Sequence, residues 1–134
     1  MLLVDASVWV SVVEQGSPYR EAAVGLIREQ AASLNALDLT LYEIANAIGV
    51  KQGDAEAANR VNRLLVKCCR DRVLPVDVEL VDFGLRIAAE HGLTAYDAAY
   101  VAASRRYGMT LVSTDIRDLV SKGLAVTPDA ADYP

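Results

Sequence analysis

Short apolar runs, separated by longer segments with helical periodicity, constrain the fold of this chain more than any other feature. Strands are expected at 2–4, 33–39, 73–76 and 110–113, with 125–127 as a further candidate. The segments between them favour helices at 8–14, 19–32, 40–49, 54–71, 78–91, 94–107 and 115–122. Strands that alternate with helices are typical of a parallel sheet covered on both faces. The sequence therefore predicts an α/β fold with three layers, α/β/α, around a mostly parallel sheet.

Length and composition limit the class of protein. A chain of 134 residues suits one domain, 1–134, and with 53% apolar residues it can bury its own core. No apolar run approaches the roughly 20 residues that a membrane span needs. The two cysteines, Cys68 and Cys69, are adjacent in a helical segment and are poorly placed to form a disulfide. We therefore expect a cytoplasmic protein.

The charge is distributed unevenly along the chain. The net charge is −5, which argues against tight nonspecific binding to nucleic acid, but residues 51–72 carry a net +3. Arg60, Arg63, Lys67 and Arg70 follow one face of the helix expected there, opposite an apolar face. A solvated helix face is the simpler explanation. As a second hypothesis, Arg60, Arg63 and Lys67 contact RNA phosphates, which would position RNA without reading its sequence.

Four acidic residues occupy settings that are otherwise apolar. They are Asp5 in LLVDAS, Glu43 in LTLYEIANAI, Asp97 in TAYDAAYVAAS and Asp115 in TLVSTD. An unpaired carboxylate in such a setting is costly. Asp5 and Asp115 each follow an expected strand, so a parallel sheet would bring them to the same edge, where open α/β folds bind ligands. A cation would offset the repulsion within such a cluster, and hard oxygen ligands suit Mg²⁺ or Mn²⁺.

Each acid also has a structural explanation. Asp5 and Asp115 fit helix N-caps, while Thr40 with Glu43 and Thr94 with Asp97 match the spacing of a capping box. The two roles are compatible, because a helix N-terminus helps to keep a carboxylate ionised. Ser7 is either a residue of the first helical turn or an auxiliary group that orients a carboxylate or a metal-bound water.

The aromatic residues beside these motifs allow two interpretations. Tyr42 and Tyr96 directly precede Glu43 and Asp97, so they either pack in the core or stack on bases near the site. Trp9 is expected to pack. Because the chain has a single histidine, it offers almost none of the side chains needed for a zinc site or a histidine-based nucleophile triad.

Taken in order, these motifs resemble those of the PIN-domain ribonucleases of the VapC toxin type, over essentially the whole chain. The resemblance implies a PIN-like fold and a Mg²⁺- or Mn²⁺-dependent endoribonuclease acting on RNA. It also implies a homodimer, and inhibition by a VapB-like antitoxin that lies in a groove near the site, here expected beside Trp9, Val12 and Val13. Its catalytic and metal-binding positions correspond to Asp5, Glu43, Asp97 and Asp115, with Asp118 as an auxiliary acid.

Two other classes of protein remain open at this point. One is a catalytically silent PIN-like module that binds RNA or protein. The other is a receiver domain that accepts a phosphoryl group, which also gathers acids around Mg²⁺. A receiver normally has an acidic pair after its first strand and a lysine near its last strand. Asp5 stands alone here, and the lysines are elsewhere, at Lys51, Lys67 and Lys122.

Overall fold

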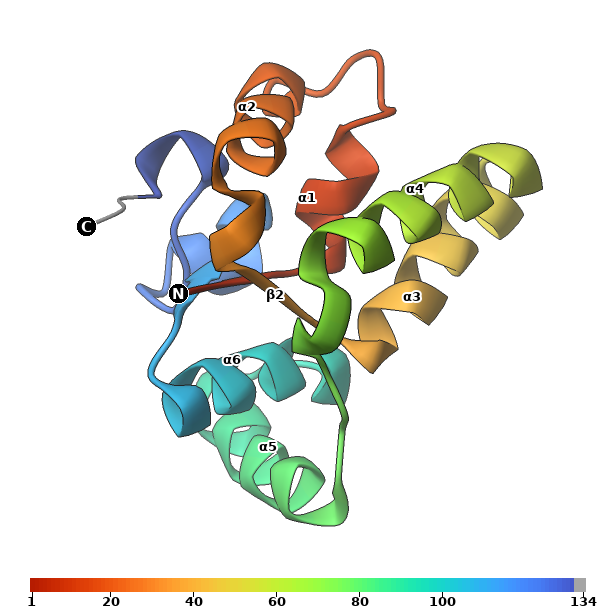
Figure 1. The fold of residues 1–134 in the computed structure, drawn as a ribbon. Helices are drawn as coiled ribbons and strands as arrows, with labels where there is room; N and C mark the ends of the chain where they lie inside the picture. The colour runs from red at the N-terminus through yellow and green to blue at the C-terminus, as the bar shows by residue number, and fades with distance from the viewer. Residues whose placement is uncertain (132–134) are drawn as a thin grey trace.

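The computed structural model describes residues 1–131 and is built on a parallel sheet (Figure 1). The four strands lie in the order β3-β2-β1-β4, and every pairing between them is parallel. Their bounds are β1 Leu2–Val4, β2 Leu34–Leu37, β3 Val73–Leu74 and β4 Thr110–Val112. Helices cover both faces of the sheet, so the predicted three-layer α/β/α class is confirmed.

The central strand β1 is buried on both of its faces because its side chains alternate between two cores. Leu2 and Val4 enter the core beneath α1, α2 and α4, whereas Leu3 enters the core beneath α5 and α6. The helices on the first face are α1 Ala6–Ser11, α2 Arg20–Gln30, α3 Asp38–Ile44 and α4 Ala55–Cys69; those on the second are α5 Val78–His91 and α6 Ala95–Tyr107.

Several helix ends follow directly from the local sequence. Asp54 accepts a hydrogen bond from the amide of Ala57 at 3.0 Å and is the N-cap of α4. Gly92 and Gly108 end α5 and α6 in the left-handed conformation, which a residue without a Cβ adopts at little cost. The strand β3 lies at the edge of the sheet. The following residue, Pro75, has no backbone N–H to donate, and at a sheet edge this costs no hydrogen bond between strands.

Some expected elements differ in the structure. The first helix spans Ala6–Ser11 instead of 8–14, and it starts earlier because Asp5 caps it directly after the strand. The helix after β2 starts at Asp38 and continues as a π-helix, η2 Ala45–Lys51. The helix expected at 115–122 is also a π-helix, η4 Ile116–Val120. No strand forms at 125–127, where Val126 makes a single parallel bridge to Val112. The remaining turns are 3-10 helices, η1 Ala31–Ser33, η3 Arg70–Arg72 and η5 Pro128–Ala130.

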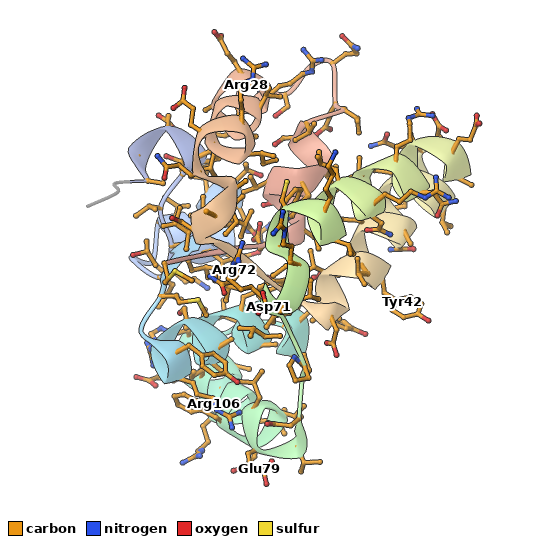
Figure 2. All side chains as sticks on the ribbon, viewed as in Figure 1. Arg28, Tyr42, Asp71, Arg72, Glu79 and Arg106 are labelled. Carbon is orange, nitrogen blue, oxygen red and sulfur yellow. The ribbon has the colours of Figure 1, made fainter. Side chains whose placement is uncertain are left out.

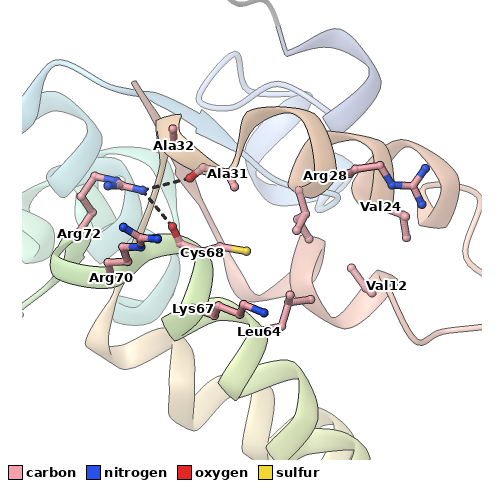
Figure 3. Close-up of a pocket in the computed structure, with 11 residues that line it drawn as sticks. Val12, Val24, Arg28, Ala31, Ala32, Leu64, Lys67, Cys68, Arg70 and Arg72 are labelled. Carbon is pink, nitrogen blue, oxygen red and sulfur yellow. Dashed lines mark hydrogen bonds between the residues drawn. The ribbon is translucent and has the colours of Figure 1, made fainter.

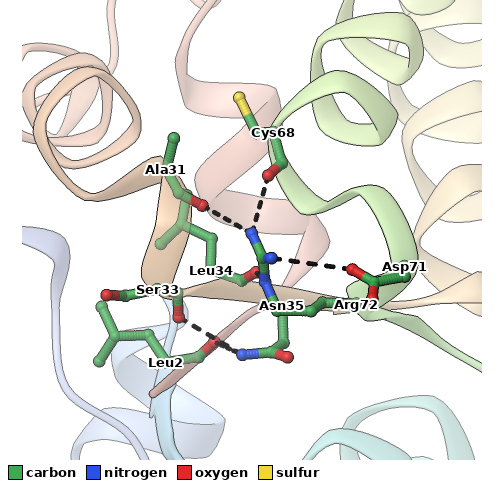
Figure 4. A network of polar contacts seen from close by, with 8 residues as sticks. All are labelled: Leu2, Ala31, Ser33, Leu34, Asn35, Cys68, Asp71 and Arg72. Carbon is green, nitrogen blue, oxygen red and sulfur yellow. Dashed lines mark hydrogen bonds and ion pairs between the residues drawn. The ribbon is translucent and has the colours of Figure 1, made fainter.

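Arg72 fastens the amino-terminal edge of the sheet (Figure 4). Its guanidinium donates to the carbonyl oxygens of Leu34, Ala31 and Cys68 at 3.0, 3.1 and 3.0 Å. These acceptors belong to β2, to η1 and to the end of α4, so one side chain joins three segments. The planar guanidinium suits this task because its donors have fixed directions.

The strand order places a topological switch at β1. The chain moves from β1 to β2 and β3 on one side, then returns to β4 on the other side of β1. In open α/β sheets, ligands bind at the carboxyl ends of the strands beside such a switch. The carboxyl end of β1 is therefore the natural place for a site. Within residues 1–131, no helix combines the length and the apolar character needed to cross a membrane.

Candidate metal centre

Asp5 stands at the carboxyl end of β1, where strand pairing fixes its backbone. Its amide donates to the carbonyl oxygen of Val112 on β4 at 3.1 Å. Its carboxylate accepts from the amide of Ser7 at 3.0 Å and also from the Ser7 hydroxyl, so Asp5 is the N-cap of α1. The side chain is buried, with 5% of the residue exposed. Ser7 lies in the first helical turn and donates to this carboxylate, and its auxiliary role at a metal site stays a prediction.

A pair of serines joins the ends of β1 and β4. The hydroxyl oxygens of Ser7 and Ser113 lie 3.3 Å apart, and the Ser7 hydroxyl accepts from the amide of Thr114 at 2.9 Å. The Ser113 hydroxyl accepts from the amide of Asp115 at 3.0 Å. Sequence reasoning missed Ser113, although a serine directly after a buried strand and two residues before an acid was a usable signal. Together the two serines fix where both acids leave the sheet.

Three carboxylates converge beside this edge. Asp97, Asp115 and Asp118 each offer an oxygen, and these oxygens lie within 4.8 Å of one another. Asp97 lies in the first turn of α6, whose N-cap Thr94 accepts from the Asp97 amide at 3.1 Å. Asp115 caps η4 and accepts from the amide of Asp118 at 3.0 Å. Asp118, which was expected only as an auxiliary acid, is thus a full member of the group.

Glu43 reaches the same region from α3. Its Oε1 accepts a hydrogen bond of 2.6 Å from the hydroxyl of Tyr100 on α6. The capping box expected between Thr40 and Glu43 is wrong, because the helix begins earlier and Leu37 is its N-cap. The Thr40 hydroxyl instead accepts from the amide of Leu37 at 3.2 Å. The sequence pattern did not single out Tyr100 as a site residue, because an aromatic residue on a buried helix face indicates only core packing.

The pKa values indicate how the acids influence one another. Burial raises the pKa of Asp5 to about 7, against hydrogen bonds from Ser113 and Ser7 that lower it. Burial is also the largest cause of the raised pKa of Glu43, and the charge of Asp97 adds to it. For Asp97, burial and then the charges of Asp115 and Asp118 raise the pKa. The acids therefore interact as one cluster, although Asp5 and Glu43 lie outside the 4.8 Å group.

The donor set fits a hard divalent cation. Two oxygens bound to the same Mg²⁺ ion lie at most about 4.2 Å apart, because each Mg–O bond is about 2.1 Å. The oxygens of Asp97, Asp115 and Asp118 lie within 4.8 Å of one another, so small side-chain rotations would bring all three to one ion. Carboxylate oxygens without nitrogen or sulfur favour Mg²⁺ or Mn²⁺ over zinc or copper. A bound ion would also offset the mutual repulsion described above.

The other residues singled out from the sequence have definite positions. Core packing is wrong for Tyr42 and Tyr96, which are 81% and 60% exposed; Tyr42 projects from α3 into solvent (Figure 2). Trp9 is fully buried, so its packing role is confirmed, and it cannot line a surface groove. The basic candidates Arg60, Arg63 and Lys67 are exposed on α4, and their contact with RNA stays a prediction.

Comparison with known proteins identifies the family to which this chain belongs. The PIN domain family model matches residues 2–121. Ribonuclease VapC3 of Pyrobaculum aerophilum is 36% identical over 136 residues, which cover 95% of this chain and 98% of that protein. This chain therefore belongs to the PIN domain family, and the resemblance inferred from the motifs is confirmed.

Solved structures share the fold. The crystal structure of VapC20 from Mycobacterium tuberculosis, described as a sarcin-ricin loop cleaving toxin, superposes with a TM-score of 0.74 at 18% identity, covering 92% of this chain and 95% of that one. A toxin–antitoxin complex from Klebsiella pneumoniae superposes with a TM-score of 0.70 at 16% identity, covering 96% and 98%. At these identities the likeness supports the fold alone.

Proposed function

We propose that this protein is a metal-dependent endoribonuclease and the toxin of a VapBC-type toxin–antitoxin pair. The observation that carries the proposal is the convergence of Asp97, Asp115 and Asp118, with Asp5 and Glu43 beside them, at the switch point of the sheet. Membership of the PIN domain family and the likeness to a protein named ribonuclease VapC3 support it. The free cysteines suit a reducing cytoplasm.

Each acid has a role that suits its surroundings. Asp97, Asp115 and Asp118 would hold Mg²⁺ or Mn²⁺ through their converging oxygens. Asp5 is buried and held by two serines, which suits a fixed ligand or an acceptor for a metal-bound water. Glu43 is half-buried, so its carboxylate can complete the cluster or orient the attacking water. A bound ion would supply a Lewis acid and lower the pKa of a coordinated water, so no protein nucleophile is needed.

Cleavage of a circular single-stranded RNA tests the activity, because a circle has no ends and only an endonuclease opens it. We expect opening with Mg²⁺ or Mn²⁺, none with EDTA, and a loss of at least about a hundredfold in Asp97→Asn. Asp82→Asn is the matched control, since Asp82 is exposed on α5 and pairs with Arg86 at 3.4 Å. Folded protein that binds RNA and leaves both circular and linear RNA intact would support the silent module instead.

The antitoxin is proposed to occupy a cavity of about 630 Å³ between α1, α2 and α4 (Figure 3). Its floor is apolar, with Val12, Ile27 and Leu64 among the lining residues, and its rim carries only cations, from Arg28, Lys67, Arg70 and Arg72. A basic rim is unusual for a chain of net charge −5. It suits an amphipathic partner segment with acidic side chains beside its apolar face. The proposed antitoxin groove therefore includes Val12, as expected, but not Trp9, which is buried.

Binding of the VapB-like antitoxin that we propose provides the test. Leu64→Glu places a charge on the cavity floor and should weaken antitoxin binding by at least about tenfold in calorimetry. Val66→Glu is the control, because Val66 is exposed on the same helix but lies outside this cavity. If Val66→Glu abolished binding and Leu64→Glu did not, the antitoxin would sit elsewhere.

A homodimer is proposed through a second apolar groove of about 490 Å³ between α3, α5 and α6. Tyr42, Val81, Leu85 and Tyr96 line it and are exposed, and Asp38 is the one charged side chain among its lining residues. An apolar surface of this kind marks a protein interface, and a groove without cations offers nothing to RNA phosphates. A two-fold axis would place the same face of both copies in contact.

The mass of the protein in solution tests this interface. Leu85→Glu should convert a dimer to a monomer in light scattering, whereas Val50→Glu, at an exposed position away from the groove, should not. If Leu85→Glu left the mass unchanged and Tyr42→Ala lowered RNA affinity, the groove would serve base stacking instead of dimerisation.

A further inference from the structure

Tyr100 is a buried hydroxyl that connects two of the helices carrying candidate catalytic acids. It lies three residues after Asp97 on α6, and 1% of the residue is exposed. Its hydroxyl donates to Oε1 of Glu43 on α3 at 2.6 Å. Among the hydrogen bonds of residues 1–131, this is the one that a side chain donates to Glu43. The helix that supplies Asp97 therefore also holds the carboxylate that α3 supplies.

The bond between Tyr100 and Glu43 is the last step of a directed chain of donors. The amide of Leu37, at the end of β2, donates to the Thr40 hydroxyl at 3.2 Å. The hydroxyls of Thr40 and Tyr100 lie 2.8 Å apart. Because a tyrosine hydroxyl has a single proton and this one goes to Glu43, Thr40 must be the donor in that contact. The direction of the chain is thus fixed from the sheet backbone to the carboxylate.

Burial shields the first two links of this chain from water, and only the last link ends on a half-buried group. Thr40 is fully buried and Tyr100 nearly so, whereas Glu43 is only half-buried. A half-buried glutamate has several rotatable bonds and would otherwise sample many positions. The hydrogen bond occupies Oε1 alone, and no residue of the described part of the chain donates to Oε2. One oxygen is thus held while the other stays free.

We propose that Tyr100 is a positioning residue, which holds the Glu43 carboxylate in one orientation at the acidic edge so that its second oxygen faces the reaction. The proposal rests on the proposed function, because it gives Glu43 a part in cleavage. A hydroxyl that only satisfied the core would predict a different outcome: its removal would change stability, and activity would fall equally whether or not Glu43 carried a charge.

Tyr100→Phe removes the oxygen and keeps the ring, and a double-mutant cycle with Glu43→Gln separates these accounts. We expect Tyr100→Phe to lower kcat by about tenfold with little change in KM, and to have almost no further effect in the Glu43→Gln background. Thr40→Val should give a smaller loss of the same kind. Tyr107→Phe is the control, because Tyr107 is exposed on the same helix. Equal losses of kcat in both backgrounds would overturn the proposal.

A crystal structure of Tyr100→Phe gives a readout that does not depend on RNA. We expect the Glu43 carboxylate to leave its position and become mobile, while the backbone of α3 and α6 stays in place. If the carboxylate stayed in place without its donor, the positioning role would be rejected. If the carboxylate moved and the wild-type protein cut no RNA, the proposed function would fail, and with it the catalytic purpose of the contact, whereas the restraint of Glu43 by Tyr100 would be established on its own.

Discussion

The amide of Asp118 donates to the carboxylate of Asp115 at 3.0 Å, and both side chains also contribute an oxygen to the group within 4.8 Å. Asp115 is therefore a helix cap and a candidate ligand at once. Capping restrains the carboxylate, and the helix N-terminus favours its ionised form. Asp5 combines the same two roles at α1. In this protein the structural and the functional explanations of an acid coincide.

Removal of one acid from the cluster should have opposite effects with and without metal. In EDTA, Asp97→Asn relieves repulsion from Asp115 and Asp118, so its Tm should equal or exceed that of the wild type. With Mg²⁺ at a hundred times its Kd, the wild type should gain about 2.7 kcal/mol, and the variant much less. Thermal unfolding with and without Mg²⁺ measures both effects. An equal gain in Asp97→Asn and in the control Asp82→Asn would contradict the assignment of Asp97.

The metal-free protein should lose stability as pH rises through the acid range. Burial raises the pKa of Asp5 to about 7, whereas an unfolded aspartate titrates near 3.9. Between about pH 4 and pH 7 the folded state therefore binds more protons, so the contribution of Asp5 to the free energy of unfolding falls by a few kcal/mol and stays low above pH 7. Asp5→Asn lacks this dependence.

Urea denaturation of both proteins in EDTA at pH 5 and pH 8 checks this. The stability of Asp5→Asn relative to the wild type should be clearly greater at pH 8 than at pH 5. A difference between the two proteins that did not change with pH would mean that Asp5 titrates normally.

Ser7→Ala should raise the pKa of Asp5 further. The Ser7 hydroxyl donates to the ionised carboxylate, and this hydrogen bond lowers the pKa. A hydrogen bond to a charged group contributes about 1.5 kcal/mol or more, so its loss should raise the pKa by about 1. Carbon-detected NMR titration of the aspartates measures the change. Ser121→Ala, at an exposed hydroxyl on the end of η4, should leave the titration as it is in the wild type.

Arg72→Met should destabilise the fold without touching the acids. The substitution leaves the carbonyl oxygens of Leu34, Ala31 and Cys68 without their shared donor, and the expected cost is about 3 kcal/mol of the free energy of unfolding. Arg63→Met, on the exposed face of α4, should cost less than about 0.5 kcal/mol. Urea denaturation compares them, and similar values for the two variants would mean that the Arg72 network contributes little.

Much of the fold follows from local patterns in the sequence. The helix 78–91 has the predicted bounds because an acid caps it and Gly92 ends it. The strand at 2–4 and the edge position of 73–74 also follow from apolar runs and from Pro75. The edge shared by Asp5 and Asp115 was predictable too, since parallel strands bring their carboxyl ends together. Local errors arose where helices changed to π-helical winding, which has no clear local signature.

The sequence by itself determined which segments become strands and helices and which acids leave the sheet, because caps, apolar periods and turn residues act over a few positions. Only the tertiary structure decided that Asp118 joins Asp97, that Tyr100 holds Glu43, and that Tyr42 lies outside the core. These relationships depend on which faces of helices meet across the sheet. That choice is made by packing of the whole core, which no local stretch of sequence contains.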